Sequence, residues 1–528
     1  MRFHRSLSVF TRLRNPPRRH EGTEKGSRFW QLRALVPSRH FDKGNVGPLA
    51  VAFIIISVAS VLLGAQAPDR GKAPGLGAPP TLHLPAIQKR QLSNGLPVWM
   101  VELHEVPVAQ VNLVVLSGAA TDPRGKFGVT SLMTAMLEEG AGSRSSLEIS
   151  DAIDFLGADL GSGSTFDSSA VRLHVPVARL ADALPVMADV ALRPTFPAEE
   201  LGRLRQQRLT ALLQARDDPG TIAAQALPRV LYGPTHRYGT GTAGTAETIG
   251  AITVADLRAQ YASLFRPANS VLIVVGDIVP DQVMPLLEAQ FGKWQSTTAA
   301  AGAALPAVDQ PARRQVSIVD KPGAPQTQIR IGWIGVARST PDFFPIQVMN
   351  TILGGSFSSR LNMNLREKHG YAYGATSAFD MRVAPGPFAA AAGVQTDKTA
   401  EALKEFFNEL NAIRQPVPAD ELARAKNYVA LRFPSAFEST TDMSRRLEDA
   451  VVYRLPDDYF SKYVSNIEAV TAADVQRVAT KYIQPDRLAV VVVGDRKVIE
   501  AGIRGLNLGE IKPLAIDDVF GPAPSLQR

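Results

Sequence analysis

Hydrophobic and polar residues follow two spacings along this chain, one typical of strands and one typical of helices. Alternation predicts half-buried strands over Gln110–Leu116 and Gln328–Ile334. Continuous apolar runs that end at Gly-Asp predict short buried strands over Val271–Val275 and Leu488–Val493. Apolar residues at helical spacing predict helices over Val129–Leu137, Ser146–Leu156, Val177–Ala191 and Glu199–Ala215.

Two further helices are indicated by their start signals. Thr253 and Thr471 each stand before an apolar-periodic segment, and Asp256 and Asp474 follow three residues later. A threonine whose hydroxyl caps the helix and an acidic residue three positions on form a capping box. We therefore expect both segments to begin helices in the same way.

The chain contains an internal repeat at a constant offset of 218 residues. Phe265–Asp277 (FRPANSVLIVVGD) matches Ile483–Asp495 (IQPDRLAVVVVGD), and Pro107–Leu113 matches Pro325–Ile331 without a gap. The two threonine caps obey the same offset. Separate blocks at one offset indicate a tandem duplication of a whole domain rather than a short-period solenoid.

The order of strands and helices predicts an α+β fold with two homologous sandwich domains, in which helices cover one face of a mainly antiparallel sheet. We place the first domain at 85–295 and the second at 315–515. An Ala/Pro-rich linker over 296–314 separates them, and a Pro/Gly-rich linker over 68–84 precedes them. A leader over 1–67 and a tail over 516–528 complete the chain.

The net charge of +7 is concentrated in the leader. Residues 1–46 hold 11 basic and three acidic residues, and the apolar run Val46–Gly64 and then Ala65-Gln66-Ala67 follow. This layout predicts a secretory signal cleaved after Ala67, and hence export to the periplasm. An uncleaved inner-membrane anchor is one alternative, and an Arg-rich mitochondrial presequence is another.

From residue 68 onward the chain carries 46 basic and 47 acidic residues, so its net charge is about −1. The charge therefore gives no argument for a nucleic-acid partner. The absence of cysteine excludes disulfides, a thiolate zinc site, an iron–sulfur cluster and a cysteine nucleophile. A Gly-x-Ser-x-Gly elbow is also missing, and Leu353–Ser356 lacks the Lys-Ser/Thr of a phosphate loop. We expect Leu353–Ser356 to be a loop after a helix.

Three passages carry a family resemblance. Leu92–Val101 (LSNGLPVWMV) and Gly118–Ala135 (GAATDPRGKFGVTSLMTA) resemble the opening of the insulinase/pitrilysin zinc peptidases. Ser358–Gly374 (SSRLNMNLREKHGYAYG) is similar to the signature of their second half. The resemblance covers about residues 85–510, nearly all of the chain after the leader.

Catalytic members of that family carry H-x-x-E-H on a helix. The two histidines bind zinc, the glutamate acts as general base, and a later glutamate completes the protein ligands. In this sequence the motif positions hold Ser131, Leu132, Met133, Thr134 and Ala135. The later helix, Leu201–Arg216, has no acidic residue, and the ligand position falls near Thr210 or Ala211. The resemblance therefore implies a chain that binds no metal.

Other candidate ligands are scattered. Glu138 and Glu139 follow the degenerate motif, and we interpret them as a surface helix end. The histidines after the leader have no metal-binding spacing, and we expect each to be a surface or hydrogen-bonded residue. These histidines are His83, His104, His174, His236 and His369.

Two polar residues of the second-half signature are retained. Arg366 and Tyr373 match the L-R-x-K-x-G-x-x-Y pattern, and the resemblance implies that they hold substrate and stabilise the oxyanion at a zinc site in trans. The alternative is an ordinary salt bridge for Arg366 and a core position for Tyr373. We expect Tyr371 to be merely packed.

In the heterodimeric branch of the family, one subunit carries zinc and its partner supplies the Arg/Tyr pair. The resemblance therefore implies a non-zinc, co-catalytic subunit, with zinc expected in an H-x-x-E-H partner and peptides as substrates. One alternative is a peptide-binding or assembly protein without a protease role. The other is a self-sufficient metallopeptidase with an unrecognised site.

A peptide-binding strand edge is also implied. Ala158–Ser169 (ADLGSGSTFDSS) leads into a predicted strand over Ala170–Val175. In relatives the equivalent strand edge pairs with an extended substrate peptide. The alternative is a plain surface turn and strand.

Overall fold

The computed structural model describes residues 84–296 and 305–524. The predicted leader, its cleavage site after Ala67 and His83 lie outside the described residues, as do nearly all of the first linker, much of the second and the last residues of the tail. Within the described part of the chain, no helix has both the length and the apolar character needed to cross a membrane.

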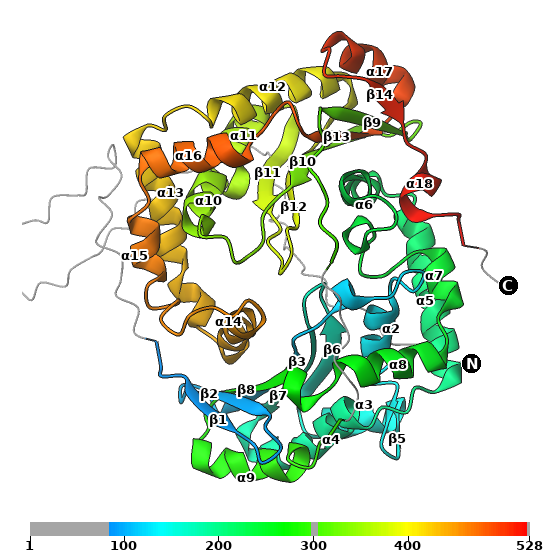
Figure 1. Ribbon diagram of the computed structural model, residues 1–528, viewed down its shortest axis with the longest axis vertical. Helices are drawn as coiled ribbons and strands as arrows, with labels where there is room; N and C mark the ends of the chain where they lie inside the picture. The colour runs from blue at the N-terminus through cyan, green and yellow to red at the C-terminus, as the bar shows by residue number, and fades with distance from the viewer. Residues whose placement is uncertain (1–83, 297–304, 525–528) are drawn as a thin grey trace, which may run out of the picture. The chain divides into compact units, whose positions relative to one another are not determined.

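The first domain is built on a mixed six-stranded sheet (Figure 1). The strand order is β1-β2-β8-β3-β7-β6, and only the β2–β8 pair is parallel. The strands are β1 (Gln88–Gln91), β2 (Pro97–Glu102), β3 (Val108–Val115), β6 (Asp159–Ser164), β7 (Ser169–Pro176) and β8 (Ser270–Gly276). A small separate sheet pairs β4 (Gly140–Ala141) with β5 (Arg144–Ser145).

The second domain repeats this plan. The strand order is β11-β12-β10-β13-β9-β14, and the β13–β9 and β9–β14 pairs are parallel. The strands are β9 (Gln315–Asp320), β10 (Gln326–Ile334), β11 (Ala372–Phe379), β12 (Pro387–Gln395), β13 (Ala489–Gly494) and β14 (Ile511–Pro513). The prediction of two mainly antiparallel α+β domains is confirmed.

The helices of the first domain are α2 (Val129–Ala135), α3 (Ser146–Phe155), α4 (Leu180–Leu192), α5 (Ala198–Ala215), α6 (Pro219–Tyr232), α7 (Ala246–Ala251), α8 (Val254–Leu264) and α9 (Pro280–Phe291). Those of the second are α10 (Phe343–Asn350), α11 (Arg360–Asn362), α12 (Thr399–Ala412), α13 (Ala419–Arg432), α14 (Thr440–Val452), α15 (Tyr463–Glu468), α16 (Ala472–Tyr482), α17 (Arg496–Gly505) and α18 (Ile516–Phe520). The four helices predicted from periodicity are present as α2 to α5, and the two predicted from their caps as α8 and α16; the other helices were not predicted.

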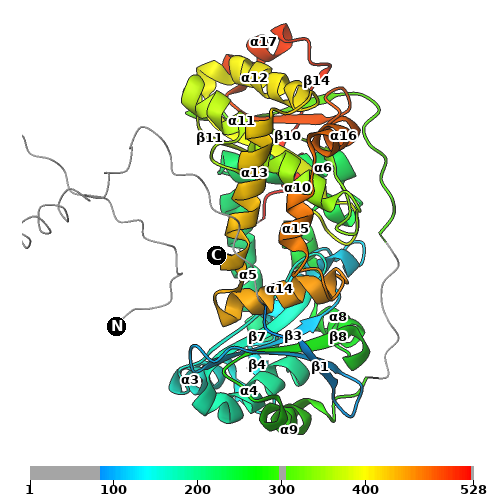
Figure 2. The same cartoon turned by 90° about the vertical axis from the view of Figure 1, so that its left-hand side faces the viewer.

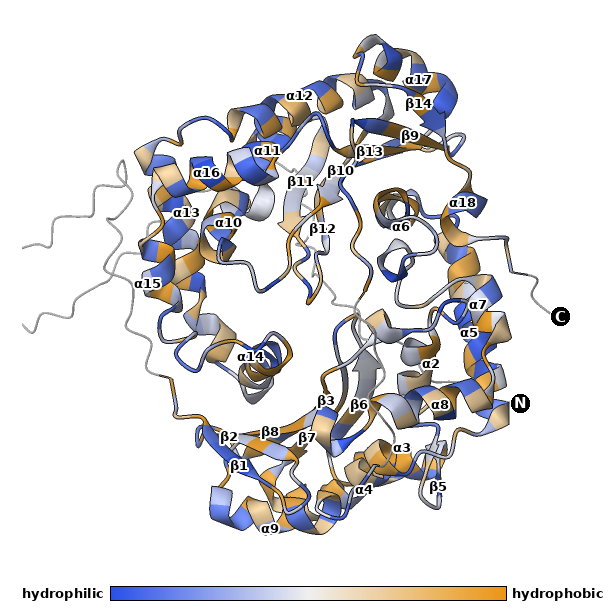
Figure 3. Ribbon diagram, in the orientation of Figure 1, coloured by the Kyte–Doolittle hydropathy of each residue, from blue (hydrophilic) through white to orange (hydrophobic). Residues whose placement is uncertain are grey.

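Both predicted capping boxes are present. The Thr253 hydroxyl accepts from the Asp256 amide at 3.2 Å, and the Asp256 carboxylate accepts from the Thr253 amide at 2.8 Å. The Thr471–Asp474 pair repeats this arrangement at 3.1 Å in both directions. Each box satisfies amide groups that a helix leaves unpaired at its start, which contributes about 1 kcal/mol. Helix α12 presents one apolar and one polar face, because its buried Leu403, Phe407 and Leu410 recur at helical spacing (Figure 3).

The expectation that helices cover one face of each sheet was incomplete, because the second face is covered by a helix from the other half of the chain. Leu227 of α6 belongs to a buried cluster with Val491 and Val493 of β13. Leu447 of α14 clusters in the same way with Ile273 of β8 (Figure 2). Strands β8 and β13 are buried along their whole length, which is why both are continuous apolar runs.

Two local predictions need correction. Leu353, Gly354 and Gly355 do not form a loop, because α10 continues as a π-helical turn over Thr351–Gly355; Ser356 follows the turn in an extended conformation. A side-chain carbon on Gly354 would lie 2.4 Å from the backbone nitrogen of Ser377 in β11, so this turn passes too close to the strand for any larger residue. The tail expected from 516 begins with α18, whose Val519 and Phe520 are buried in the cluster that contains α6.

Candidate functional site

Helix α2 carries the degenerate motif and begins on a buried ion pair. The Asp122 carboxylate accepts from the backbone amides of Gly128 at 2.7 Å and Thr130 at 3.1 Å. Arg237 donates to the same carboxylate at 2.9 Å. The Arg237 side chain is 2% exposed and the Asp122 side chain is 0% exposed. Burial raises the pKa of Asp122, and the charge of Arg237 opposes that rise. The pair joins the start of α2 to the segment that follows Arg237.

Ser131, at the first ligand position of the motif, contacts an arginine. Arg208 of α5 donates through Nη1 to the Ser131 hydroxyl at 3.0 Å and through Nη2 to the Ser131 carbonyl at 2.6 Å. Burial lowers the pKa of Arg208 to about 10, and no acidic group among the described residues offsets this effect. A guanidinium therefore lies beside the position that a zinc ligand occupies in the motif.

The remaining motif positions offer no ligands either. The Thr134 hydroxyl is buried and donates to the Ser131 carbonyl at 3.2 Å. The Ala135 side chain has no atom that can coordinate a metal. Of the two candidates for the later glutamate, Ala211 lines the same cavity as Ser131, whereas the exposed Thr210 donates back to its own helix. Zinc requires His, Cys, Asp or Glu ligands, so these residues do not fit the metal. Within the described ranges, no cluster of such side chains could hold a metal ion.

The interpretation of Glu138 as a surface helix end is wrong. Helix α2 ends at Ala135, and Glu138 is half-buried beside the edge strand β6. The Ser162 hydroxyl lies 2.5 Å from the Glu138 carboxylate and 2.7 Å from the Thr134 carbonyl. Burial raises the pKa of Glu138, although the bond from Ser162 opposes it. Glu139 is paired with a cation of α5, Arg203, at 2.6 Å.

The histidines in the described part of the chain lie apart from one another. His104 is exposed and lies 2.7 Å from Asp277, which raises its pKa. His236 accepts from the Tyr238 amide at 3.1 Å and its ring contacts a backbone carbonyl at 3.2 Å. Among the described residues, His174 departs from the expectation of a satisfied or exposed histidine, because its buried Nδ1 has no hydrogen-bond partner. The buried Nε2 of His369 has no hydrogen bond there either, although it lies 4.0 Å from the Glu405 carboxylate.

Arg366 and Tyr373 lie together on the surface of the second domain. Arg366 belongs to a π-helical turn, η6 (Met363–Lys368), and Tyr373 to the edge strand β11. The guanidinium carbon lies 4.9 Å from the centre of the Tyr373 ring and 4.8 Å from that of Phe357.

The alternative of a core position for Tyr373 is wrong, since this residue is 85% exposed. Arg366 does form an ion pair, at 3.0 Å, with its neighbour Glu367. Tyr371 stacks on His369 and packs against the core, as expected. A π-helical turn often marks a functional site, and no sequence signal reveals it here.

The peptide-binding edge predicted near Ala158–Ser169 lies on a strand that periodicity missed. Strand β6 forms within that segment and is the edge of its sheet, whereas β7 is paired on both sides. Two glycines, Gly161 and Gly163, obscure the alternation of β6. A cavity of about 370 Å³ lies against β6, and Arg172 and His174 of β7 also line it.

Arg208 is the residue of this region that the sequence reasoning missed. The zinc-ligand pattern concerns only acidic and histidine side chains, so it gives no reason to select a basic residue on α5. A signal did exist, because positions 208, 211 and 212 lie on one helical face. The structure therefore brings Ser131, Arg208 and Ala211 together in the first domain and places Arg366 and Tyr373 in the second.

Comparisons with known proteins identify the family models and the relatives that the chain matches. Residues 98–239 match the family model described as insulinase, peptidase family M16, and residues 251–429 match the model of the peptidase M16 inactive domain. A protein named as an uncharacterized zinc protease of Streptomyces coelicolor is 25% identical over 417 residues, which cover 78% of this chain and 90% of that protein. One of Bacillus subtilis is 23% identical and covers 68% of this chain and 87% of that protein.

Solved structures show the same fold. A peptidase M16 inactive domain from Pseudomonas fluorescens is similar with a TM-score of 0.70 and 29% identity, covering 78% of this chain and 98% of that one. A protease from Helicobacter pylori is similar with a TM-score of 0.73 and 21% identity, covering 78% of this chain and all of that one, 100%. The duplicated fold and the two consecutive family matches lead to one conclusion: the chain belongs to the insulinase family of peptidases, family M16.

Proposed function

We propose that this chain is the zinc-less, co-catalytic subunit of a heterodimeric insulinase-family peptidase. One observation carries the proposal: Arg366 and the exposed Tyr373 lie side by side, while a guanidinium contacts the motif helix where catalytic members hold zinc. The chain would contribute part of a peptide-degrading chamber. A homologous partner with H-x-x-E-H would contribute zinc and its water.

The chemistry of the pair suits that role. A guanidinium and a phenol both donate hydrogen bonds, and a peptide bond under attack develops negative charge on its carbonyl oxygen. The exposed Tyr373 ring leaves its hydroxyl available to a group outside this chain. The free edge of β6 would bind an extended peptide by strand addition. We further propose that the chain is exported to the periplasm, on the basis of its basic and apolar leader.

The experiment is reconstitution with the zinc-bearing homologue. The full chain and that homologue are mixed, and cleavage of a quenched fluorescent peptide is measured. We expect each protein alone to be inactive and the mixture to be active. Arg366→Ala and Tyr373→Phe should each lower kcat by about 10²–10³-fold, the range for removing one oxyanion donor.

Matched controls separate chemistry from folding. Tyr371→Phe changes a packed tyrosine in the same segment, and Lys368→Ala removes a charge from the same π-helical turn as Arg366. Both should keep activity within about twofold, because surface changes away from a site have small effects. Full activity of both the Arg366 and the Tyr373 variants in the mixture would refute the proposed role.

A further inference from the structure

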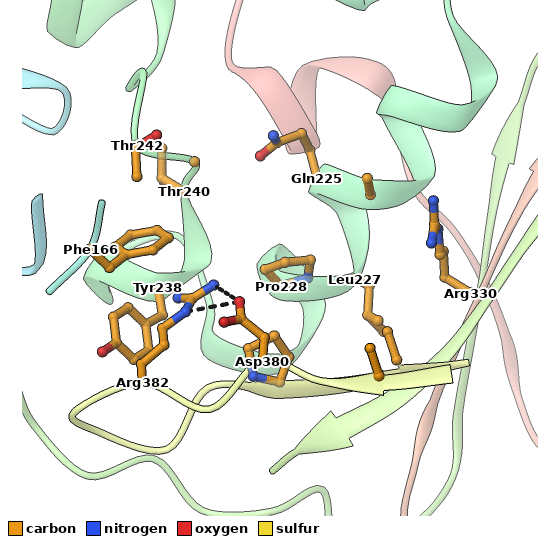
Figure 4. A pocket seen from close by; sticks show the side chains of 15 residues that line it. Phe166, Gln225, Leu227, Pro228, Tyr238, Thr240, Thr242, Arg330, Asp380 and Arg382 are labelled. Atoms are coloured by element: carbon orange, nitrogen blue, oxygen red, sulfur yellow. Dashed lines mark hydrogen bonds and ion pairs between the residues drawn. The ribbon is translucent and has the colours of Figure 1, made fainter. Parts of the chain in front are cut away.

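Two neighbouring cavities lie between α6, the segment after Arg237 and elements of both domains. Their volumes are about 420 Å³ and about 380 Å³. They share lining residues Gln225, Thr240, Gly241 and Thr242, so they adjoin each other along α6. The larger one extends to Ser131 and Arg208, at the degenerate motif, and the smaller one extends to the second sheet (Figure 4).

Arginines lie at both ends of this paired cavity. Arg208 lines the larger part and donates hydrogen bonds to Ser131 through two of its nitrogens. Its guanidinium has no acidic partner among the described residues. Because a planar guanidinium carries five N–H donors, Arg208 retains donors for a further acceptor. Arg208 is half-buried, and a partly desolvated cation without a counterion is stabilised when an anion joins it.

The smaller part contains two more guanidiniums. Arg330 of β10 has a buried Nε with no hydrogen-bond partner in the described part of the chain, and burial lowers the pKa of Arg330. The Arg382 guanidinium lies 4.0 Å from the centre of the Phe166 ring and 4.4 Å from that of Tyr238, and it pairs with Asp380 at 2.5 Å (Figure 4). Its Nη1 is also buried without a partner.

The cavity as a whole has an excess of positive charge. Asp380 is the single acidic residue among those that line either part, against three arginines. Threonine hydroxyls and the Gln225 amide supply neutral hydrogen-bonding groups, and Ala211, Leu212 and Phe520 supply apolar surface. An arginine fork matches a carboxylate bidentately, and the apolar walls suit the carbon skeleton that carries such a group.

We propose that this paired cavity binds carboxylate-bearing peptides, with Arg208 and Arg330 as the carboxylate-binding residues. The carboxylate comes either from a peptide C-terminus or from an acidic side chain. Arg208, which lies beside the degenerate zinc motif, thus binds a carboxylate. The inference goes beyond the co-catalytic role and is independent of it, since it requires no partner subunit.

The test is isothermal titration of the full chain with three peptides. They are N-acetyl-pentaalanine with a free C-terminus, the same peptide as its amide, and the amidated acetyl-Ala-Glu-Ala-Glu-Ala. We expect at least one carboxylate peptide to bind tenfold or more tightly than the neutral amide. The free-terminus and glutamate peptides distinguish the two sources of the carboxylate. Added salt should weaken binding, because charged groups form the contact.

Variants assign the residues. Arg208→Gln and Arg330→Gln, from different domains, should each weaken binding by about tenfold or more, the loss expected for a charge-assisted contact. Arg445→Gln is the matched control, because this arginine is 67% exposed and outside the cavity, and its affinity should equal that of the unmodified chain. Circular dichroism establishes that each variant is folded, and Arg208→Lys retains the charge if Arg208→Gln does not fold.

The proposal is overturned by any of three results. These are equal binding of the amide and the carboxylate peptides, unchanged binding in both arginine variants, or no binding of any carboxylate peptide at millimolar concentration. None of these results changes the cleavage assay with the partner, so failure here is distinct from failure of the co-catalytic role.

Discussion

Replacing Arg237 with methionine should be severely destabilising, because it leaves a buried carboxylate without its cation. The Arg237 guanidinium also donates to the carbonyls of Ala119 at 2.6 Å and Thr240 at 2.8 Å, so both would lose a partner. Removing one member of a buried ion pair costs about 3–5 kcal/mol. We therefore expect Arg237→Met to lower the free energy of unfolding of the first domain by about that amount.

A double-mutant cycle isolates the pair. Asp122→Asn removes the charge and keeps one acceptor oxygen, which can accept from the Gly128 amide or from the Thr130 amide but not from both, because these amides donate to different oxygens of the carboxylate. The double variant, Asp122→Asn with Arg237→Met, should lose less stability than the sum of the single changes, by about 0.5–3 kcal/mol of coupling. Urea unfolding followed by tryptophan fluorescence and circular dichroism measures all four proteins.

The pH dependence supplies a second readout. A carboxyl whose pKa is higher in the folded than in the unfolded state lowers the stability only above its unfolded-state pKa of about 3.9. This loss of stability grows as the pH rises from that value through the folded-state pKa. Burial already raises the pKa of Asp122, and loss of Arg237 removes the charge that opposes the rise. The defect of Arg237→Met should therefore shrink as the pH falls from 7 toward 4. A defect below about 1 kcal/mol at pH 7, or one that grows in acid, would refute the reasoning.

Three further predictions concern charges elsewhere. Glu448→Ala should lower the unfolding free energy by about 1–3 kcal/mol, because Arg172 on the other domain then loses a bidentate partner at 2.7–2.8 Å; equal urea midpoints would contradict this. Arg208→Met should leave the unfolding free energy within about 1 kcal/mol, because it removes a half-buried cation that has no acidic partner among the described residues, along with its bonds to Ser131; a loss above about 3 kcal/mol would be inconsistent. Two cations and a tyrosine hold the pKa of Asp342 below its ordinary value, so its contribution is present at pH 7 and declines in acid; Asp342→Asn should lower the melting temperature at pH 7, and this difference should shrink steadily as the pH falls below about 4.

Much of the fold could be predicted from local patterns. The strands Ser270–Gly276 and Ala489–Gly494 are continuous apolar runs because both faces are buried, and the Thr253 and Thr471 boxes specify where two helices begin. Strand β6 was missed because its glycines remove the alternation on which strand prediction depends.

The candidate site was only half predictable. The loss of zinc ligands follows from residue identity, since Ser131 and Ala135 cannot replace histidine whatever their surroundings. The burial of Glu138 could not be foreseen in the same way. Its environment is set by Ser162 on β6, a strand that lies elsewhere in the sequence. The spacing of polar residues along a predicted helix shows which positions are polar. It does not show which distant residues contact them.

The sequence by itself determined the duplication, the family, the kinds of elements and the degenerate metal motif, because periodicity, capping and residue chemistry are local properties. Only the tertiary structure decided that α6 and α14 each cover the sheet of the other half, and that Arg208 lies beside Ser131. It also decided that three arginines line one paired cavity and that Arg366 lies beside an exposed Tyr373. The physical reason is that these relations join residues distant in sequence, and packing across the whole core selects them.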